Sequence, residues 1–432
     1  MPYDNFSYSF GSSGTDVELV QLALSRSGLY SGTLDGVFDI QTQKAVDQFQ
    51  FSRGLPKTGV VDSVTFSNML PLLKGYTVIR AAQGDSFCSI ASAYNSSAAA
   101  ISAANPNLSP DLIPANTPVT VPFSFNVVCD KIRFSSRFLS FCVDGLLARY
   151  PFLSYRTIGK SVMGKPLHCI SAGCGNNVVL YIAAHHANEW MTSIILMKFL
   201  EDISSAFAQN ADIAGFPASE LFSSSKIVLI PMLNPDGVDL AAGALSSGPF
   251  FMSAKDISSR FPAIPFPQGW KANIRGTDLN LNYPAQWDTA EKIKYSLGFS
   301  CPAPRDFVGA NPLSEPESRA LYDFTRSLSP SLVLAYHSQG EVIYWKFLNS
   351  CSPSAYSIAK KLSSVSGYSL DDAPYSSSFA GFKDWFIQDF DRPAYTVEVG
   401  LGSNPLPLSL FPKIYSDNLP LLLTAALPCG RP

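Results

Sequence analysis

Apolar residues at helical spacing predict three short helices near the start of the chain. Val17, Val20 and Leu24 mark the first of them, and the same spacing recurs twice more before residue 74. Turn-forming residues separate the three segments. We therefore expect a three-helix bundle over residues 10–74, preceded by a loose lead-in at residues 1–9.

A different pattern follows over residues 76–123. Residues 76–78 have the composition of a short strand, and an apolar stripe at helical spacing begins at Phe87. The Gly-Asp-Ser sequence before Phe87 is typical of a helix N-cap. A second short helix and a strand at residues 119–122 complete the segment. We expect a small unit with the order strand, helix, helix, strand.

Beyond residue 134, apolar runs with the length of strands alternate with longer helical stretches. The runs have few polar positions, which is typical of strands buried on both faces of a sheet. Alternation of such strands with helices indicates a largely parallel sheet covered by helices. We expect one large α/β domain over residues 134–428, with strands near residues 178–183, 227–230, 332–335 and 395–399.

The charge and the lengths of the apolar stretches disfavour several classes of binding partner. The 432 residues carry a formal net charge of −3, so the chain lacks the basic excess that favours nucleic acid or an anionic membrane. No apolar stretch reaches the ~20 residues of a membrane-spanning helix. The chain starts without a basic segment followed by an apolar one, and we expect cytoplasmic synthesis without a secretory signal. The eight cysteines form no Cys-x-x-Cys pair, which favours reduced thiols.

Two of the four histidines follow predicted strands. One apolar run leads into His185 and His186, with Glu189 three residues after His186, and another run leads into His337. The carboxyl ends of parallel strands meet at one edge of a sheet, so these three side chains can converge on one metal ion. Three protein ligands and a fourth position for water are the pattern of catalytic zinc. His185 and His168 are interpreted as packed structural residues.

An ordered series of motifs accompanies these residues along the second half of the chain. The series resembles that of the zinc carboxypeptidases over residues 134–428. The resemblance implies an α/β/α sandwich around a mixed, mostly parallel sheet. The motifs, in order, are Asn234-Pro235-Asp236-Gly237, Asn273 with Arg275, Asp278-Leu279-Asn280, His337-Ser338, and Glu398 within Tyr395-Thr396-Val397-Glu398-Val399-Gly400.

The same resemblance implies a role for individual positions. It places one zinc ion on the three ligands named above and makes Glu398 the general base, although a satisfied buried carboxylate is the alternative for Glu398. Arg275 is the candidate for stabilising the oxyanion, a role that can shift by a residue or two. Asp278 matches the carboxylate that holds the second nitrogen of a zinc histidine. Asp236 is interpreted as a turn-former.

The two N-terminal units resemble modules that bind bacterial cell wall. Residues 10–73, with Asp35-Gly36-Val37-Phe38, are similar to the three-helix peptidoglycan-binding domain, with an unrelated helical bundle as the alternative. Residues 76–122 are similar to the LysM module, which binds glycans that contain N-acetylglucosamine. The resemblance implies that peptidoglycan is the partner of the chain.

One position departs from the pattern of the digestive carboxypeptidases. Leu281 stands where those enzymes have the arginine that binds the C-terminal carboxylate, so plain trimming of proteins is disfavoured, while Asn280 remains as a donor. Lys383 precedes the family's Asp-Trp pair and favours an acidic leaving residue, unless it is a solvated lysine. Tyr375 or a nearby serine is expected in the same pocket.

These features together resemble the γ-D-glutamyl-L-diamino acid endopeptidases of spore-forming bacteria. The resemblance implies zinc-dependent cleavage between γ-D-glutamate and meso-diaminopimelate in the stem peptides of peptidoglycan, and an association with the forespore or spore. We expect a monomer. Two alternatives remain: a general metallocarboxypeptidase that docks on wall material, and a non-catalytic peptidoglycan-binding protein.

Overall fold

The computed structural model describes residues 6–428 of the chain. It divides into two compact units, Met1–Arg133 with Arg137–Phe152, and Phe134–Ser136 with Leu153–Pro432. Part of the predicted lead-in, residues 1–5, lies outside the described residues. The rest of it is attached to the first unit, because Tyr8 forms an antiparallel bridge with Val61.

The first unit begins with three helices, as the apolar spacing predicts: α1 (Thr15–Arg26), α2 (Ile40–Ser52) and α3 (Ser63–Lys74). The Asp39 and Asp62 side chains cap α2 and α3 by accepting hydrogen bonds from backbone amides. The buried amide of Gln21 fixes the turn before α2, where it accepts a hydrogen bond from the Gly36 amide and donates one to the Val37 carbonyl.

The next segment has the predicted order of strand, helix, helix and strand. Strand β1 (Tyr76–Arg80) pairs antiparallel with β2 (Pro118–Pro122), and α4 (Phe87–Tyr94) and α5 (Ala98–Ala104) lie between them in the sequence. A capping box between Ser86 and Ser89 starts α4. The small core of this segment is formed by Phe87, Ile90, Ile101, Ile113, Val119, Val121 and their neighbours.

Helix α6 (Ser136–Arg149) groups largely with the first unit. The guanidinium of Arg149 is buried and donates hydrogen bonds to the carbonyls of Gly75, Phe123 and Phe125, so it satisfies the backbone at both ends of the β1–β2 segment. The expected start of the large domain at residue 134 stays a prediction.

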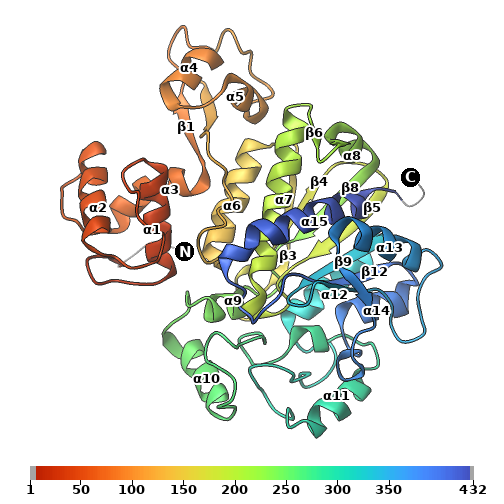
Figure 1. Ribbon diagram of the computed structural model, residues 1–432. Helices are drawn as coiled ribbons and strands as arrows, with labels where there is room; N and C mark the ends of the chain where they lie inside the picture. Colours follow the sequence, from red (N-terminus) through yellow and green to blue (C-terminus); the bar gives the residue numbers. More distant parts are fainter. Residues whose placement is uncertain (1–5, 429–432) are drawn as a thin grey trace. The chain divides into compact units, whose positions relative to one another are not determined.

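The second unit is built on an eight-stranded mixed sheet with the order β11-β10-β12-β9-β5-β8-β4-β3 (Figure 1). The four strands from β12 to β8 run parallel, and the antiparallel pairs lie towards the two edges. This confirms the predicted mixed, mostly parallel sheet. The strands are β3 (Ser154–Lys160), β4 (Pro166–Ala172), β5 (Asn177–Ile182), β8 (Ser225–Ile230), β9 (Leu332–His337), β10 (Val342–Tyr344), β11 (Ser369–Asp371) and β12 (Ala394–Glu398).

Helices cover both faces of this sheet, which gives the predicted α/β/α sandwich (Figure 1). On one face the Tyr181 hydroxyl donates a hydrogen bond to the Leu422 carbonyl of α15 (Phe411–Ala426), which also packs on α7 (Met191–Ala208). On the other face Leu180 and Ile182 share a core with Phe324 of α12 (Pro316–Leu328) and Trp385 of α14 (Phe382–Phe390).

Further elements surround the sheet. The helices are α8 (Ala218–Ser224), α9 (Pro235–Ala241), α10 (Gly248–Ser259), α11 (Trp287–Ser296) and α13 (Ala355–Ser366); a two-stranded ribbon is formed by β6 (Asp212–Ile213) and β7 (Phe216–Pro217); and single 3₁₀ turns are η1 (Ala187–Glu189), η2 (Leu279–Leu281), η3 (Tyr375–Ser377) and η4 (Leu408–Leu410).

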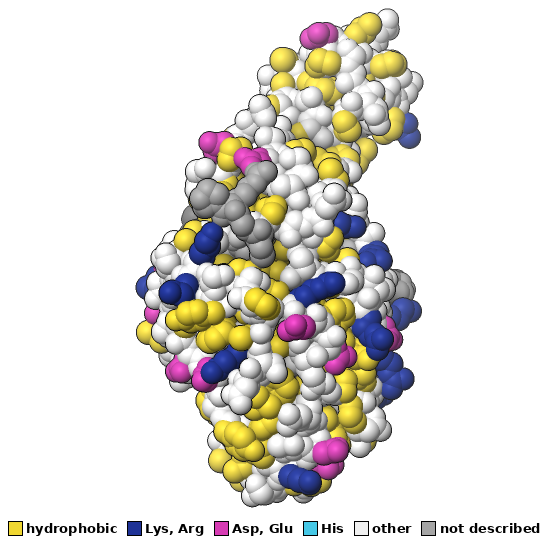
Figure 2. Space-filling view, turned by 90° about the vertical axis from the view of Figure 1, so that its right-hand side faces the viewer, with side chains coloured by type: hydrophobic (Ala, Val, Ile, Leu, Met, Phe, Trp, Pro, Cys, Tyr) yellow, Lys and Arg dark blue, Asp and Glu magenta, His cyan; other side chains and the backbone are white. Residues whose placement is uncertain are grey.

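The surface carries mixed charge. On the face shown in Figure 2, Lys and Arg side chains are scattered among Asp and Glu side chains and apolar groups, and no histidine is visible. All four histidines are buried. Within residues 6–428, none of the helices is both long and apolar enough to cross a membrane.

The side chain of Asn282 should contribute strongly to the stability of the second unit. It is fully buried; its amide group donates to the carbonyls of Val308 and Asn311, and its oxygen accepts from the Glu315 amide. We expect Asn282→Ala to lower the free energy of unfolding by about 2–4 kcal/mol, because buried polar groups lose their partners. Urea unfolding followed by tryptophan fluorescence measures this, since all five tryptophans lie in this unit. The exposed-site control Asn311→Ala should change it by less than about 0.5 kcal/mol.

Candidate metal centre and active-site cleft

Two adjacent parallel strands, β5 and β9, position the predicted metal ligands. The chain leaves β5, turns at Ala184, whose φ is 50°, and reaches His186 and Glu189 on the 3₁₀ turn η1. His337 is the last residue of the neighbouring strand β9. The carboxyl ends of these strands therefore bring the three side chains to one point, as the sequence pattern indicates.

The three side chains present a compact set of donor atoms. Nδ1 of His186 lies 3.0 Å from Oε1 of Glu189 and 3.0 Å from Nδ1 of His337, which lies 3.0 Å from Oε2 of Glu189. All three residues are buried, and their ligand atoms lie within 4.8 Å of one another. Two imidazole nitrogens and one carboxylate in this geometry fit the ligand set of catalytic zinc.

Asp278 fixes the orientation of one of these histidines. Its Oδ1 lies 3.1 Å from Nε2 of His186 and accepts the proton of that nitrogen, so Nδ1 presents its lone pair to the other ligands. The backbone amides of Asn280 and Asp306 also donate to the Asp278 carboxylate. The aspartate is thus held on both sides and in turn holds the imidazole.

The electrostatics of the ligand set favour a bound cation. Burial alone would lower the pKa of His186, but the carboxylates of Glu189 and Asp278 offset it and raise the pKa to about 9. Burial would raise the pKa of Glu189, yet His186 and Lys271 hold it well below its usual range. Two buried carboxylates thus create a strongly negative environment that a divalent ion would neutralise.

Glu398 lies at the end of β12, opposite His337 in the register of the two parallel strands. Burial, together with the negative charge of Glu189, raises the pKa of the Glu398 carboxyl to about 8. A carboxyl group with a raised pKa beside a metal site is suited to accept and to donate a proton near neutral pH.

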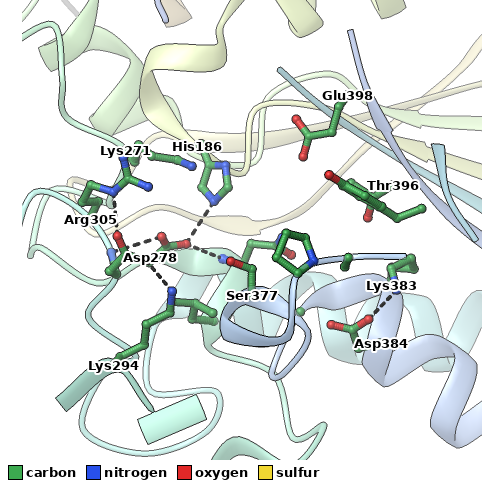
Figure 3. A pocket seen from close by; sticks show the side chains of 17 residues that line it. His186, Lys271, Asp278, Lys294, Arg305, Ser377, Lys383, Asp384, Thr396 and Glu398 are labelled. Carbon is green, nitrogen blue, oxygen red and sulfur yellow. Dashed lines mark hydrogen bonds and ion pairs between the residues drawn. The ribbon is translucent and has the colours of Figure 1, made fainter. Parts of the chain in front are cut away.

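Two cavities meet beside these residues. The first, of about 210 Å³, is lined by His186, Asp278, Asn280, Leu281, Lys294, Asp306, Lys383, Asp384 and Thr396, among others (Figure 3). The second, of about 590 Å³, is lined by the loop segments 263–265, 268–269, 338–339 and 402–404 and by Asn188. Lys271, Arg305, Tyr344 and Glu398 line both cavities and mark their junction.

Sequence comparison agrees with this geometry. The sequence model of the zinc carboxypeptidases matches residues 141–420. This chain belongs to the zinc carboxypeptidase family. Further models match a putative peptidoglycan binding domain at residues 13–69 and a LysM domain at residues 79–122. The chain is therefore a zinc metallopeptidase with modules that bind peptidoglycan.

Two relatives are each similar to about two thirds of this chain. Gamma-D-glutamyl-L-diamino acid endopeptidase 1 of Lysinibacillus sphaericus is 41% identical over 281 residues, which cover 65% of this chain and 69% of the relative. The uncharacterized protein YqgT of Bacillus subtilis (strain 168) is 37% identical over 280 residues, 64% of this chain and 72% of the relative.

Solved structures support the fold. Bovine thrombin-activatable fibrinolysis inhibitor, in complex with tick carboxypeptidase inhibitor, matches with a TM-score of 0.52 at 18% identity, covering 68% of this chain and 96% of that chain. Carboxypeptidase A from Helicoverpa armigera matches with a TM-score of 0.52 at 15% identity, covering 98% of each chain.

Two residues that the sequence analysis expected at the active site, Arg275 and Tyr375, lie away from both cavities. The Arg275 side chain is 57% exposed, pairs with Glu315 at 3.7 Å and lines neither cavity. Tyr375 is 69% exposed and packs on Phe379, whereas Ser377 from the same turn lines the first cavity. Arg275 lies in a turn and Tyr375 on the 3₁₀ turn η3, where sequence spacing does not determine the direction of a side chain.

Lys383 and Asn280 do line the first cavity, but both already have partners. The Lys383 ammonium is buried, pairs with Asp384 and donates to the Lys346 carbonyl, so it is not an isolated cation. The Asn280 oxygen accepts from the Phe382 amide. The Lys383 pair weakens the expectation that this lysine alone selects an acidic residue.

Two cations at the junction were missed by the sequence analysis. The Lys271 side chain is 19% exposed, and its ammonium lies 3.5 Å from Oε1 of Glu189. Burial lowers the pKa of Lys271, but Glu189 and Asp278 more than offset this and raise it, so the ammonium stays charged. Arg305 is the second. Both lie on irregular segments, where no apolar period marks a residue as inward-facing.

The remaining histidines have the structural roles expected of them. His185 is fully buried beside the ligands, with its Nε2 3.3 Å from the Tyr283 hydroxyl, and it is not part of the ligand group. His168 lies in β4, where its Nδ1 is 2.9 Å from the Tyr155 hydroxyl. Asp236 accepts a hydrogen bond from the Met163 amide and lies in the first turn of α9.

Removing one of the three ligand side chains should abolish the stoichiometric binding of zinc. We expect His337→Ala to retain less than about a tenth of the zinc of the wild-type protein after dialysis, because catalytic sites use three protein ligands. The matched control His168→Gln changes a buried histidine outside the ligand group and should keep one zinc per chain. Inductively coupled plasma mass spectrometry measures the metal, and circular dichroism checks the fold. Equal zinc content in His337→Ala and wild type would contradict the assignment.

Proposed function

We propose that this peptidase hydrolyses the bond between γ-D-glutamate and meso-diaminopimelate in peptidoglycan stem peptides. The observation that carries the proposal is the 41% identity, over 281 residues, to an enzyme named gamma-D-glutamyl-L-diamino acid endopeptidase 1. The two peptidoglycan-binding modules supply the matching context.

The lining of the first cavity suits the chemistry of the leaving residue. Leu281 lines this cavity and provides no charge for a C-terminal carboxylate. The wall carries both cations and carboxylates, in the ion pairs Lys294–Asp306 and Lys383–Asp384. The side chain of diaminopimelate ends in both an ammonium and a carboxylate, so a wall with both signs of charge complements it.

Glu398 would act as the proton shuttle of the reaction. Bound zinc supplies Lewis-acid chemistry and lowers the pKa of water from ~15.7 towards ~7. Glu398 takes a proton from the attacking water as the new carbon–oxygen bond forms. It then passes that proton to the nitrogen of diaminopimelate as the carbon–nitrogen bond breaks, and the product is a free amine and a carboxylic acid.

Lys271, and not Arg275, would stabilise the oxyanion of the reaction. Its ammonium is held beside Glu189 and lines the junction with Glu398. A fixed cation at this point stabilises the negative charge that develops on the carbonyl oxygen. Because the ammonium is already charged and held by its ion pair with Glu189, it needs little reorganisation during the reaction.

Two other functions remain as outcomes of the test. A general metallocarboxypeptidase would cleave ordinary C-terminal residues while docked on wall material. A non-catalytic wall-binding protein would cleave nothing. The expected association with the forespore or spore, and the expected monomeric state, stay predictions.

The deciding experiment compares a defined stem peptide with an ordinary carboxypeptidase substrate. Zinc-loaded protein should cleave L-Ala-γ-D-Glu-meso-diaminopimelate at the γ-glutamyl bond, with hippuryl dipeptides cleaved far more slowly, as followed by mass spectrometry. Glu398→Gln should lower kcat by about 10²- to 10⁴-fold and keep its zinc, because the shuttle is lost and the ligands are not. Cleavage of hippuryl substrates alone would favour the general carboxypeptidase, and stoichiometric zinc without any hydrolysis would favour the non-catalytic protein.

Lys271→Gln should lower kcat by about 10²- to 10³-fold with a small change in KM, because the cation acts on charge that develops in the transition state. Lys271→Arg should recover part of the loss. Steady-state kinetics on the same stem peptide give both constants. An increase in KM with kcat unchanged would assign Lys271 to substrate binding instead.

A further inference from the structure

Arg305 lies on a segment that is clamped against the active site. The Pro304 carbonyl accepts hydrogen bonds from the amides of Lys271 and Ala272, at 2.8 and 2.9 Å, and the Phe307 carbonyl accepts one from the Asp278 amide at 2.8 Å. The backbone on both sides of Arg305 is therefore fixed to the residues that serve the metal site. Its side chain reaches the cavity beside Lys271 (Figure 3).

The Arg305 guanidinium shares its carboxylate partner with a second cation. Asp306 is a single carboxylate shared by two cations, with Oδ1 2.6 Å from the Lys294 ammonium and Oδ2 2.6 Å from Nε of Arg305. These three groups by themselves carry one excess positive charge, and the carboxylates of Asp278 and Glu189 also act on Arg305. The carboxylate uses only Nε, so the two terminal nitrogens of the guanidinium have no hydrogen-bond acceptor among residues 6–428.

The position of Arg305 indicates which part of a substrate its guanidinium can reach. Arg305, Lys271 and Glu398 line both cavities, so the arginine lies at the junction where the scissile carbonyl must be placed. In a γ-glutamyl residue a free α-carboxylate lies only three carbons from that carbonyl. An ordinary α-linked residue has no carboxylate there unless its own side chain supplies one.

We propose that the terminal nitrogens of Arg305 bind the free α-carboxylate of the γ-D-glutamyl residue and so select the γ-linked bond. The proposal rests on the proposed function and adds a specificity residue to it. A guanidinium binds a carboxylate through two parallel hydrogen bonds, which makes arginine suited to this recognition. The Nε bond to Asp306 holds the guanidinium plane while its outer edge contacts the substrate.

The leaving residue also carries carboxylates, and a different part of the cleft faces it. Lys294 and Lys383 line the first cavity and not the second, so they lie on one side of the junction only. Arg305 is the arginine that reaches both sides. We therefore assign it to the residue that bears the scissile carbonyl.

The test compares two pairs of peptides on the zinc-loaded full-length chain. In the first pair, L-Ala-γ-D-Glu-meso-diaminopimelate is compared with its D-isoglutamine analogue, in which the α-carboxylate is an uncharged amide. In the second pair, the diaminopimelate peptide is compared with its lysine analogue, which lacks the side-chain carboxylate. Wild type should cleave the free acid about 10- to 100-fold faster than the isoglutamine peptide in kcat/KM, the range expected for hydrogen bonds to a charged group.

Arg305→Gln should remove this preference. We expect kcat/KM for the free acid to fall about 10- to 100-fold, to the level of the isoglutamine peptide, while the isoglutamine rate stays within about threefold. Arg305→Lys should recover part of the preference, because lysine keeps the positive charge but cannot form the two parallel hydrogen bonds of a guanidinium. The matched control Arg260→Gln changes an arginine whose guanidinium is 3.6 Å from the Cys301 sulfur, near the same segment, and which lines neither cavity. It should behave as wild type.

A binding measurement separates recognition from turnover. In the inactive, zinc-loaded Glu398→Gln background, isothermal titration should show tighter binding of the free acid than of the isoglutamine peptide, and Arg305→Gln should abolish the difference. If wild type cleaves both peptides of the first pair equally, or if Arg305→Gln alters only the diaminopimelate–lysine preference, the inference is overturned and the proposed function stands. If wild type cleaves none of the stem peptides, the proposed function itself fails. Should Arg305→Gln not fold, the wild-type comparison still decides the inference.

Discussion

The parallel register of β5, β9 and β12 is the constraint on which the active site depends. Because the three strands are neighbours and run in the same direction, the turn after β5 and the ends of β9 and β12 open on one edge of the sheet. His337 lies directly opposite Glu398 in this register. A one-residue slip of β12 would turn the Glu398 side chain to the other face of the sheet and separate the base from the ligands.

Charge compensation is the second requirement of this site. Glu189 and Asp278 are buried, and burying a carboxylate is costly unless a partner offsets the loss of water. His186 and Lys271 supply part of that compensation, and the zinc ion that the family binds supplies the rest. The same groups therefore stabilise the fold locally and set the electrostatic field in which a carbonyl would react.

The two binding modules and the peptidase contribute different parts of one activity. The modules bind peptidoglycan, and a covalent tether raises the effective concentration of the peptidase near the wall without any new contact to the stem peptide. Selection of the bond then rests with the cleft of the second unit. Binding to the polymer and choice of the cleaved bond are carried by separate parts of the chain.

The sequence by itself determined the modular order, the mixed sheet and the zinc peptidase family, because apolar periods and motif spacing are local properties of the chain. It also named His186, Glu189 and His337, since strand ends can be located from apolar runs, and Glu398, through the resemblance to the family. Only the tertiary structure showed that Arg275 points to solvent and that Lys271 and Arg305 reach the cleft. These residues lie on irregular segments, and there the direction of a side chain is set by long-range backbone hydrogen bonds, such as those of Pro304, that no local pattern encodes.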